Sequence, residues 1–246
     1  MNLIASILTS ILSTENAVIS WENLTPTQKQ NLQRSIDSKS HPSCVVYPHS
    51  QAELAAVITT ANSHQWRVLT WGSGSKINWG GLAENIDIIV STEHINQLIE
   101  HAVGDLTVTV EAGMKFAQIQ EILAKSGQTL ALDPAAPELA TIGGIVATAD
   151  TGSLRQRYGG VRDQLLGITF IRADGEIAKA GGRVVKNVAG YDLMKLFTGA
   201  YGTLGIISQV TFRVYPIPES SGTVILTGKP EAISQAARTL HGSELT

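Results

Sequence analysis

The segment spanning residues 181–215 constrains the fold more than any other part of this 246-residue chain. Glycine recurs there at every third position, at Gly199, Gly202 and Gly205. Such a series ends the short helix predicted over residues 191–197 and lets another backbone or a ligand approach closely. Apolar residues then alternate with polar ones over residues 209–214, which predicts a half-buried strand. Any one of these glycines alone would be interpreted as an ordinary turn residue.

Composition excludes several classes of protein. Hydrophobic residues make up 43% of the chain and charged residues 16%, which is typical of a globular protein rather than a disordered one. The net charge of −3 leaves no basic stripe for nucleic acid. Cys44 is the only cysteine, which fits a reducing compartment, and we expect a location in the cytoplasm.

The same counts bear on metals and membranes. The histidines show no HxH or HExxH spacing, so we expect no metal site. No apolar run reaches the roughly 18 residues of a membrane span. The apolar stripe at the N-terminus has no basic region before it, so it predicts an amphipathic packing helix rather than a signal peptide.

The first hundred residues predict a helical segment and then a parallel unit. Residues 1–40 are interpreted as two helices, the second beginning at Thr25 and Pro26. Strands are then expected over residues 45–48, 67–70 and 86–91, with a helix between the first two that begins after Ser50 and has Glu53 in the capping-box position. Strand, helix and strand in this order favour parallel pairing.

A glycine-rich loop, Trp71-Gly-Ser-Gly-Ser-Lys76, follows the second of these strands. A run of small residues at a strand end leaves backbone N–H groups free to bind an anion such as phosphate. The loop does not match the GxGxxG dinucleotide motif, because Ile77 stands where the third glycine would be, and no Walker A motif exists in the chain.

A second informative segment runs over residues 133–152. A strand over residues 106–112 and a helix over 116–126 come before it, and Gly143 and Gly144 then open a run of small residues. A helix that starts in this way brings bare N–H groups and its positive dipole end to a diphosphate or the polar edge of a flavin. The alternative is a tight Gly-Gly turn with small-residue packing.

The remaining elements are a hairpin and a further unit. Residues 165–172 and 176–180 predict two antiparallel strands joined by a type I′ turn at Asp174-Gly175. A strand over 223–227 and a helix over 230–240 would begin another domain.

Three segments in this order resemble the FAD-binding domain of the vanillyl-alcohol-oxidase type, also called the PCMH type. They are the loop at 71–76, Thr-Ile-Gly-Gly with Ala-Thr at 141–148, and Gly-Thr-Leu-Gly-Ile-Ile at 202–207. Val-Lys-Asn-Val-Ala-Gly-Tyr-Asp-Leu at 185–193 looks, more narrowly, like the FAD-binding subunit of glycolate oxidase, also called glycolate dehydrogenase.

The resemblance implies an α+β fold with two lobes. A small parallel βαβ lobe would span about 43–100 and a larger, mainly antiparallel lobe with helices 105–215, with FAD extended between them. The FAD-binding domain would cover 41–218, after the N-terminal helical segment 1–40, and residues 219–246 would start an incomplete C-terminal cap domain.

The resemblance also implies which residues hold FAD. The loop would bind the pyrophosphate, the segment from Thr141 the pyrophosphate and flavin side, and the last segment the cofactor through its backbone. The implied cofactor-binding residues are Gly72, Ser73, Gly74, Ser75, Lys76, Thr141, Ile142, Gly143, Gly144, Ala147, Thr148, Gly205, Ile206 and Ile207.

The sequence departs from the family pattern at Trp71, where many relatives have arginine. Charge compensation for the pyrophosphate would then come from Lys76 or from backbone N–H groups alone. No histidine lies within residues 71–76, so we expect FAD to be held without a covalent link. Tyr191 and Lys186 would meet the flavin or substrate, or else join Asn187 and Asp192 in a buried hydrogen-bond network.

By this resemblance the chain is an FAD-linked oxidoreductase component that passes a hydride from a small 2-hydroxy acid, glycolate or D-lactate, to FAD, together with partner subunits. No residue pair can be assigned as catalytic base and carboxylate clamp. Two alternatives stay open: a truncated or non-catalytic FAD-binding partner subunit, and an enzyme of the same fold acting on other substrates, such as the enolpyruvyl-reductase relatives.

Overall fold

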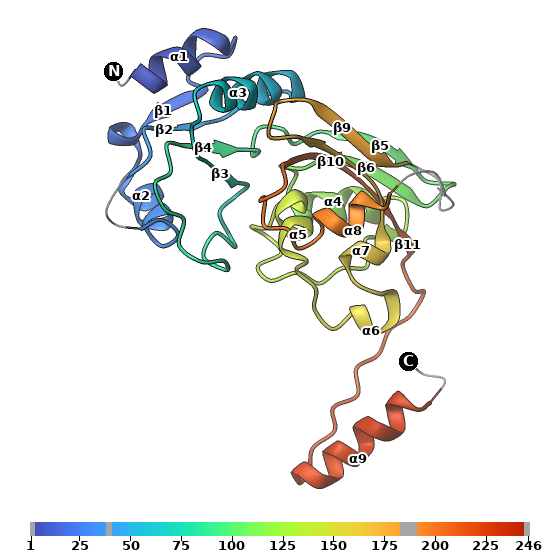
Figure 1. Ribbon diagram of the computed structural model, residues 1–246. Helices are drawn as coiled ribbons and strands as arrows, with labels where there is room; N and C mark the ends of the chain where they lie inside the picture. Colours follow the sequence, from blue (N-terminus) through green and yellow to red (C-terminus); the bar gives the residue numbers. More distant parts are fainter. Residues whose placement is uncertain (1–2, 38–40, 183–190, 244–246) are drawn as a thin grey trace.

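The structure is a computed structural model that describes residues 3–37, 41–182 and 191–243. It contains one four-stranded and one five-stranded sheet, with helices packed around them (Figure 1). The predicted two-lobed α+β fold is confirmed. Residues 183–186, whose β-prone side chains also predict a short strand from the sequence, lie outside the described residues.

The four-stranded sheet has the strand order β1-β2-β4-β3. It consists of β1 (Val18–Ser20), β2 (Cys44–Val46), β3 (Val68–Trp71) and β4 (Ile88–Ser91). β2 and β3 both pair in parallel with β4, as predicted, because α3 (Gln51–Ser63) crosses back between β2 and β3. Every residue of β2 and β4 is buried, which is usual for central parallel strands.

The N-terminal segment is not purely helical. It contains α1 (Leu3–Ile11), the 3₁₀ helix η1 (Trp21–Asn23) and α2 (Pro26–Gln33), but β1 lies between them and pairs antiparallel with β2. A three-residue edge strand is too short to show a period of two, and this is why the sequence did not reveal it. α1 lies beside α3 on the outer side of this sheet (Figure 1).

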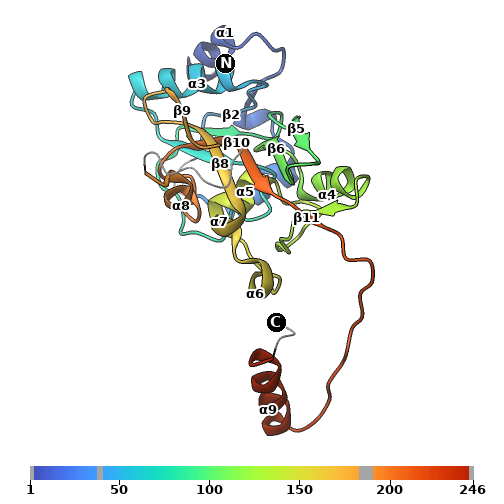
Figure 2. The same ribbon diagram turned by 90° about the vertical axis from the view of Figure 1, so that its right-hand side faces the viewer.

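The five-stranded sheet is antiparallel throughout, with the order β5-β6-β10-β8-β9 (Figure 2). Its strands are β5 (Leu98–Ala102), β6 (Thr107–Glu111), β8 (Leu165–Ile171), β9 (Ile177–Gly181) and β10 (Ile206–Arg213). The central strand β10 buries Val210 and Phe212 completely, as its alternation predicts. Thr211 on the opposite face is also buried, and a hydrogen bond of 2.9 Å between its hydroxyl and that of Thr109 satisfies both groups.

Helices cover one face of this sheet, and a small two-stranded sheet lies at its edge. The helices are α4 (Phe116–Ala124), α5 (Ile142–Thr148), α6 (Arg155–Tyr158), α7 (Val161–Gln164) and α8 (Leu193–Phe197), and β7 (Gln128–Thr129) pairs with β11 (Tyr215–Pro216). α5 lies centrally against β10, with Ile142, Ile145 and Val146 buried in the main core.

Two local predictions were wrong. The hairpin turn after β8 is not type I′, since only Gly175 has a positive φ (+88°) and its amide donates to the Arg172 carbonyl. This is the three-residue loop in which a left-handed glycine follows a type I turn. No strand forms over 223–227, where Val224 and Ile225 are 84% and 82% exposed and no strand of the described residues lies beside them.

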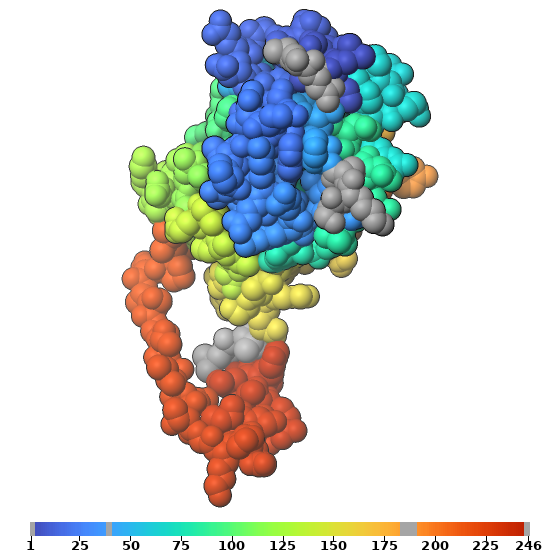
Figure 3. Space-filling view, turned by 90° about the vertical axis from the view of Figure 1, so that its left-hand side faces the viewer, coloured from blue at the N-terminus to red at the C-terminus, as the bar shows by residue number. Residues whose placement is uncertain are grey.

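The C-terminal segment stands apart from the rest of the molecule. This segment contains α9 (Pro230–His241), which follows an extended stretch of chain and has no buried residue (Figure 3). A hydrogen bond of 3.2 Å between Gln156 and the His241 ring links it to α6. The predicted domain limits at 41–218 and 219–246 stay a prediction.

Candidate functional site

A cavity of about 410 Å³ opens between the two sheets. Its walls come from the β3–β4 loop, the first turns of α5 and the chain from Tyr201 to the start of β10. All the cofactor-binding residues predicted from the sequence line it, except Ile142, which is fully buried in the main core. The three separate glycine-rich segments therefore converge on one space, whose size is in the usual range for cofactor sites.

The loop over residues 72–76 presents main-chain donors to this cavity. None of its five amides has a hydrogen-bond acceptor among the residues that the structure describes. The loop turns at Gly74, whose φ is +75°. Consecutive free N–H groups in such a turn form a concave site for an anion, so this geometry agrees with the prediction from sequence.

The start of α5 is different from what the sequence predicts. Its first amides are not bare: Ile142 donates to the Met114 carbonyl at 2.9 Å and Gly143 to the Ala112 carbonyl at 2.8 Å. The Gly144 amide donates to the hydroxyl of Thr141, the helix N-cap, at 3.3 Å. The expected diphosphate-binding N–H groups at this helix start are thus already satisfied within the protein.

The glycines of α5 instead permit close packing. A Cβ on Gly143 would lie 2.7 Å from the Ala112 Cβ and 2.9 Å from its carbonyl oxygen. Gly72 on the opposite wall is equally constrained, since a Cβ there would lie 2.2 Å from the Thr141 hydroxyl. Gly72 therefore lies directly against the Thr141 side chain. The alternative interpretation from the sequence, small-residue packing, describes Gly143, whereas a Cβ on Gly144 would come within 4 Å only of the Thr141 hydroxyl, at 3.1 Å.

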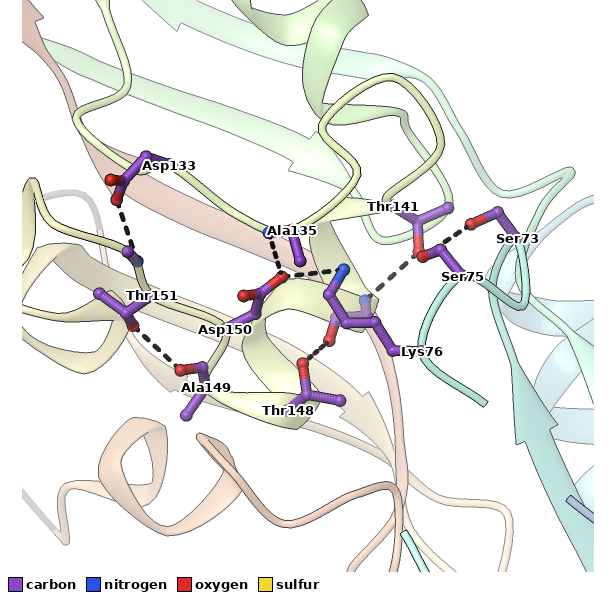
Figure 4. Close-up of polar contacts among 12 residues, drawn as sticks. Ser73, Ser75, Lys76, Asp133, Ala135, Thr141, Thr148, Ala149, Asp150 and Thr151 are labelled. Atoms are coloured by element: carbon purple, nitrogen blue, oxygen red, sulfur yellow. Dashed lines mark hydrogen bonds and ion pairs between the residues drawn. The ribbon is translucent and has the colours of Figure 1, made fainter. Parts of the chain in front are cut away.

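Lys76 forms a buried ion pair at the edge of the cavity (Figure 4). Its Nζ lies 3.1 Å from the Asp150 carboxylate, and both side chains are more than nine-tenths buried. Asp150 also accepts a hydrogen bond of 3.0 Å from the Ala135 amide. Because Asp150 already neutralises Lys76, the second alternative from the sequence is favoured: an anionic group in the cavity would depend on backbone donors rather than on an unmatched lysine.

The third wall contains a residue that sequence analysis missed. Tyr201 lines the cavity with a φ of +52°, an unusual conformation for an aromatic residue, and its amide donates to the Ala147 carbonyl at 2.8 Å. Gly202 follows with φ +76°, and a Cβ there would lie 2.3 Å from the Thr70 hydroxyl. The glycine spacing predicted that another backbone or a ligand could approach this turn closely, but nothing in the pattern indicated Tyr201.

The residues of the 185–193 motif do not reach this cavity in the part that can be described. Lys186 and Asn187 lie outside the described residues. Tyr191 is 91% exposed, which is incompatible with the buried network considered for it. Asp192 caps α8 and pairs with Lys195 at 2.8 Å, and the hydrogen bond from Lys195 lowers the pKa of Asp192.

Two absences apply to the described part of the chain. No helix within it has the length and apolar character to cross a bilayer. Across residues 3–37, 41–182 and 191–243, no three acidic, histidine or cysteine side chains gather as metal ligands would.

The lining of the cavity suits the pyrophosphate of a dinucleotide. The amides of residues 72–76 are unpaired within the described chain, and position 72 requires glycine, because a Cβ there would lie 2.2 Å from the Thr141 hydroxyl. Unpaired main-chain donors in a glycine-rich turn are suited to binding an anionic group. Together with the two-lobed fold, these features define a module that binds a dinucleotide cofactor.

Comparisons with known proteins agree with this class. A family model described as FAD binding domain matches residues 42–181. The chain belongs to this family, and its cofactor is FAD. A solved structure of alkyldihydroxyacetonephosphate synthase shares the fold, with a TM-score of 0.73 and 19% identity over 88% of this chain and 41% of that one.

Curated relatives are similar over most of the chain. Glycolate oxidase subunit GlcD of Bacillus subtilis is 31% identical over 82% of this chain and 43% of its own length. A mitochondrial D-lactate dehydrogenase [cytochrome] of Arabidopsis thaliana is 32% identical over 73% of this chain and 31% of its own. D-2-hydroxyglutarate dehydrogenase of Stutzerimonas stutzeri is 30% identical, over 77% and 41%. The chain thus spans less than half the length of these relatives.

Proposed function

We propose that this chain is the FAD-binding part of an oxidoreductase that oxidises a small 2-hydroxy acid, with glycolate and D-lactate as first candidates. The observation that carries the proposal is the convergence of three glycine-rich segments on one cavity with free main-chain donors. The relatives named for glycolate, D-lactate and D-2-hydroxyglutarate support the substrate class. The narrower likeness of residues 185–193 to the FAD-binding subunit of glycolate oxidase stays part of this proposal.

Oxidation of a 2-hydroxy acid to its 2-oxo acid removes a hydride from the carbon, which FAD accepts, and a proton from the hydroxyl. The reaction also needs a base for that proton and a cation for the carboxylate. Among the described residues that line the cavity, Lys76 is the one cation, and Asp150 matches its charge. We therefore propose that the substrate-binding groups come from other parts of a longer protein or from a partner subunit.

If the substrate-binding groups lie outside this chain, the alternative function is that of a non-catalytic FAD-binding subunit. In both cases residues 41–218 would be the cofactor domain and 219–246 the start of a further domain. The exposed apolar residues Val224, Ile225 and Leu226 favour contact of this last segment with protein that is not part of the described chain. A cytoplasmic location, at the membrane only through partners, remains our expectation.

The test is a visible spectrum of the purified protein after reconstitution with FAD, followed by glycolate or D-lactate without oxygen. Flavin bands that bleach support catalysis by this chain, whereas bands that persist until a partner subunit is added support the alternative. Failure to retain FAD contradicts both. Acid precipitation should release all the FAD into the supernatant, since we propose that it is held non-covalently.

A further inference from the structure

His49 and His94 form a pair of imidazole rings that does not line the FAD cavity. His49 immediately precedes the N-cap of α3, and His94 lies in the connection between β4 and β5. The His94 Nδ1 and the His49 Nε2 are 2.9 Å apart, and the ring centroids are separated by 4.4 Å. The two residues are 45 positions apart in the chain, so histidine spacing in the sequence could not indicate this pair.

The parallel lobe positions both rings and leaves them open to solvent. β2 and β4 are neighbouring parallel strands, so the segments that follow them meet at the same edge of the sheet. The His49 amide donates to the Glu53 carboxylate at 2.7 Å, and the His94 ring packs against the buried Tyr47, with ring centroids 5.4 Å apart. Both histidines are exposed, so an ion from solvent can reach their nitrogens.

The separation of these nitrogens suits a shared metal ion. Two imidazole nitrogens that each lie about 2.0–2.1 Å from one ion are about 2.9 Å apart at a bond angle of about 90°, and about 3.3 Å apart at the tetrahedral angle. The observed 2.9 Å therefore matches two adjacent positions of a square-planar or octahedral ion. As it stands, the contact is a hydrogen bond in which one ring donates and the other accepts, and a metal ion would replace the shared proton.

A hollow beside the pair offers oxygen atoms as further ligands. It is lined by the two histidines together with Asn96 and Gln97. Asn96 donates from Nδ2 to the Glu93 carbonyl at 2.9 Å, which leaves its Oδ1 without a hydrogen bond among the described residues. An amide oxygen or water can complete the coordination of an ion that two imidazoles hold.

We propose that His49 and His94 bind one divalent transition-metal ion of the kind that prefers imidazole nitrogen, namely Ni²⁺, Cu²⁺ or Zn²⁺. The ion would tie the start of α3 to the segment that leads from the four-stranded sheet to the five-stranded one. This site lies outside the proposed FAD-binding role and does not depend on it.

The test is calorimetric titration of the untagged, metal-free protein with NiCl₂ in the absence of FAD. Wild type should bind one Ni²⁺ ion per chain, and His49→Gln and His94→Gln should each weaken binding about tenfold or more, because a single imidazole cannot chelate. The double variant should lose little more than either single variant, since the two rings act as a unit.

His64→Gln is the matched control. His64 is also exposed, but its ring contacts the Thr60 carbonyl at 3.0 Å and the Ser63 hydroxyl at 3.1 Å rather than a second histidine. Its replacement should leave the Ni²⁺ affinity unchanged. The side chains altered in all these variants are exposed, so we expect each variant to fold as wild type does.

Two further measurements do not depend on the calorimetry. NiCl₂ should raise the midpoint of thermal unfolding of wild type and of His64→Gln, but not that of His49→Gln or His94→Gln. With CuCl₂, the electron paramagnetic resonance spectrum of wild type should show hyperfine splitting from two nitrogens, and each of these two variants should lose one of them.

Several outcomes would overturn the inference. Wild type that binds no Ni²⁺ contradicts it, and so does an unchanged affinity in His49→Gln or His94→Gln. An equal loss in His64→Gln would show that Ni²⁺ binds exposed histidines without selection. Because the titration contains no FAD, failure of the chain to bind that cofactor would contradict the proposed function and leave the metal result standing.

Discussion

Two glycine-rich segments face each other across the cavity and use their main-chain donors in opposite ways. The amides of residues 72–76 have no acceptor in the described chain, whereas those of Ile142, Gly143 and Gly144 are all paired. The difference follows from position: the loop leaves a strand end and faces the cavity, while α5 is pressed against β10 and the residue Ala112 after β6. Glycine content alone therefore does not predict an anion site, because only the loop over residues 72–76 has the unpaired amides that such a site needs.

The comparison also separates stability from binding. The wall formed by α5 is part of the main core, so changes there should act on the free energy of unfolding. The wall formed by residues 72–76 is a loop anchored by the Lys76–Asp150 pair, so changes in its glycines should act first on the affinity for FAD.

The largest effect is expected from breaking that ion pair. Lys76→Met leaves the Asp150 carboxylate buried without its cation, and the free energy of unfolding should fall by about 3–5 kcal/mol. The double variant with Asp150→Asn should lose less than the sum of the two single changes, because the two residues act as a unit. Urea unfolding curves measure both.

The control for this prediction is Lys195→Met. Its pair with Asp192 is as short, 2.8 Å, but the side chains are 57% and 41% exposed. Water screens such a pair, so the loss should stay below about 1 kcal/mol. Equal losses in the two variants would show that the buried pair does not anchor the loop.

Cys44 offers an independent readout of the same change. Burial raises the pKa of its thiol to about 12, so the folded protein should react very slowly with thiol reagents at neutral pH. Cys44 lies in β2, within the sheet that carries the loop. Faster labelling in Lys76→Met than in wild type would locate the loss of stability in that sheet.

The next largest loss of stability is expected from a change in α5, the wall of the cavity that belongs to the main core. Gly143→Ala places a methyl group against Ala112, and overpacking of this kind should cost about 1–3 kcal/mol. Gly144→Ala is the matched control, since a Cβ there comes within 4 Å only of the Thr141 hydroxyl, at 3.1 Å, and alanine favours the helix. The midpoint of thermal unfolding should therefore fall more in Gly143→Ala than in Gly144→Ala. A larger fall in Gly144→Ala would contradict the packing role of Gly143.

Gly72→Ala tests the contact between the two walls. A methyl group there would push the loop away from Thr141, and we expect FAD affinity to fall about tenfold while stability changes by less than about 1 kcal/mol. Thr141→Ala in the same chain should restore part of the affinity by removing the obstructing atoms. Gly104→Ala, which has nothing within 4 Å of its Cβ position and does not line the cavity, should bind FAD as wild type does.

The smallest effect is expected at the start of α3, which covers the sheet that carries the loop. Burial alone would raise the pKa of Glu53, but hydrogen bonds from the His49 amide and the Ser13 and Thr14 hydroxyls lower it below 4.5. Since the folded pKa is the lower one, the stabilisation is present above about pH 4.5 and is lost as the pH falls through the folded value.

Glu53→Gln should therefore cost about 1 kcal/mol at pH 7 and almost nothing near pH 3. Unfolding curves of both proteins across this range measure the difference. A gap that stays constant with pH would show that the carboxylate charge contributes nothing. The sequence placed Glu53 in a capping box with Ser50, but its partners are the neighbouring His49 amide and the hydroxyl of Ser13, 40 residues away.

The sequence predicted what local patterns determine. Period-two alternation and turn residues located β6, β8, β9 and β10, and the strand–helix–strand order indicated the parallel sheet. β5 was missed because Leu98 and Ile99 are adjacent and both partly exposed, so no alternation marks the strand. The strand expected over 223–227 does not form for the opposite reason: its pattern is favourable, but no strand in the described part of the chain lies beside it to pair with it.

The site was predictable as a set of glycine-rich segments but not in its chemistry. Small residues indicated where main chain could approach, and the predicted residues other than Ile142 do meet. The Lys76–Asp150 pair joins residues 74 positions apart, and no local rule links them. The sequence also could not show that the first amides of α5 are paired. Their acceptors are the carbonyls of Ala112 and Met114, which only the tertiary fold brings close to this helix.

The two sheets share apolar residues at their junction. Ile171 and Ile206, from β8 and β10, belong to the cluster that contains β2 and β4, and the Gly113 amide donates to the Ile95 carbonyl at 2.7 Å. Cutting the polypeptide between β5 and β6 would therefore give two fragments that each expose an apolar face. Such halves should regain a native structure only when mixed, so a split version of this chain would behave as a complementation pair rather than as two independent modules.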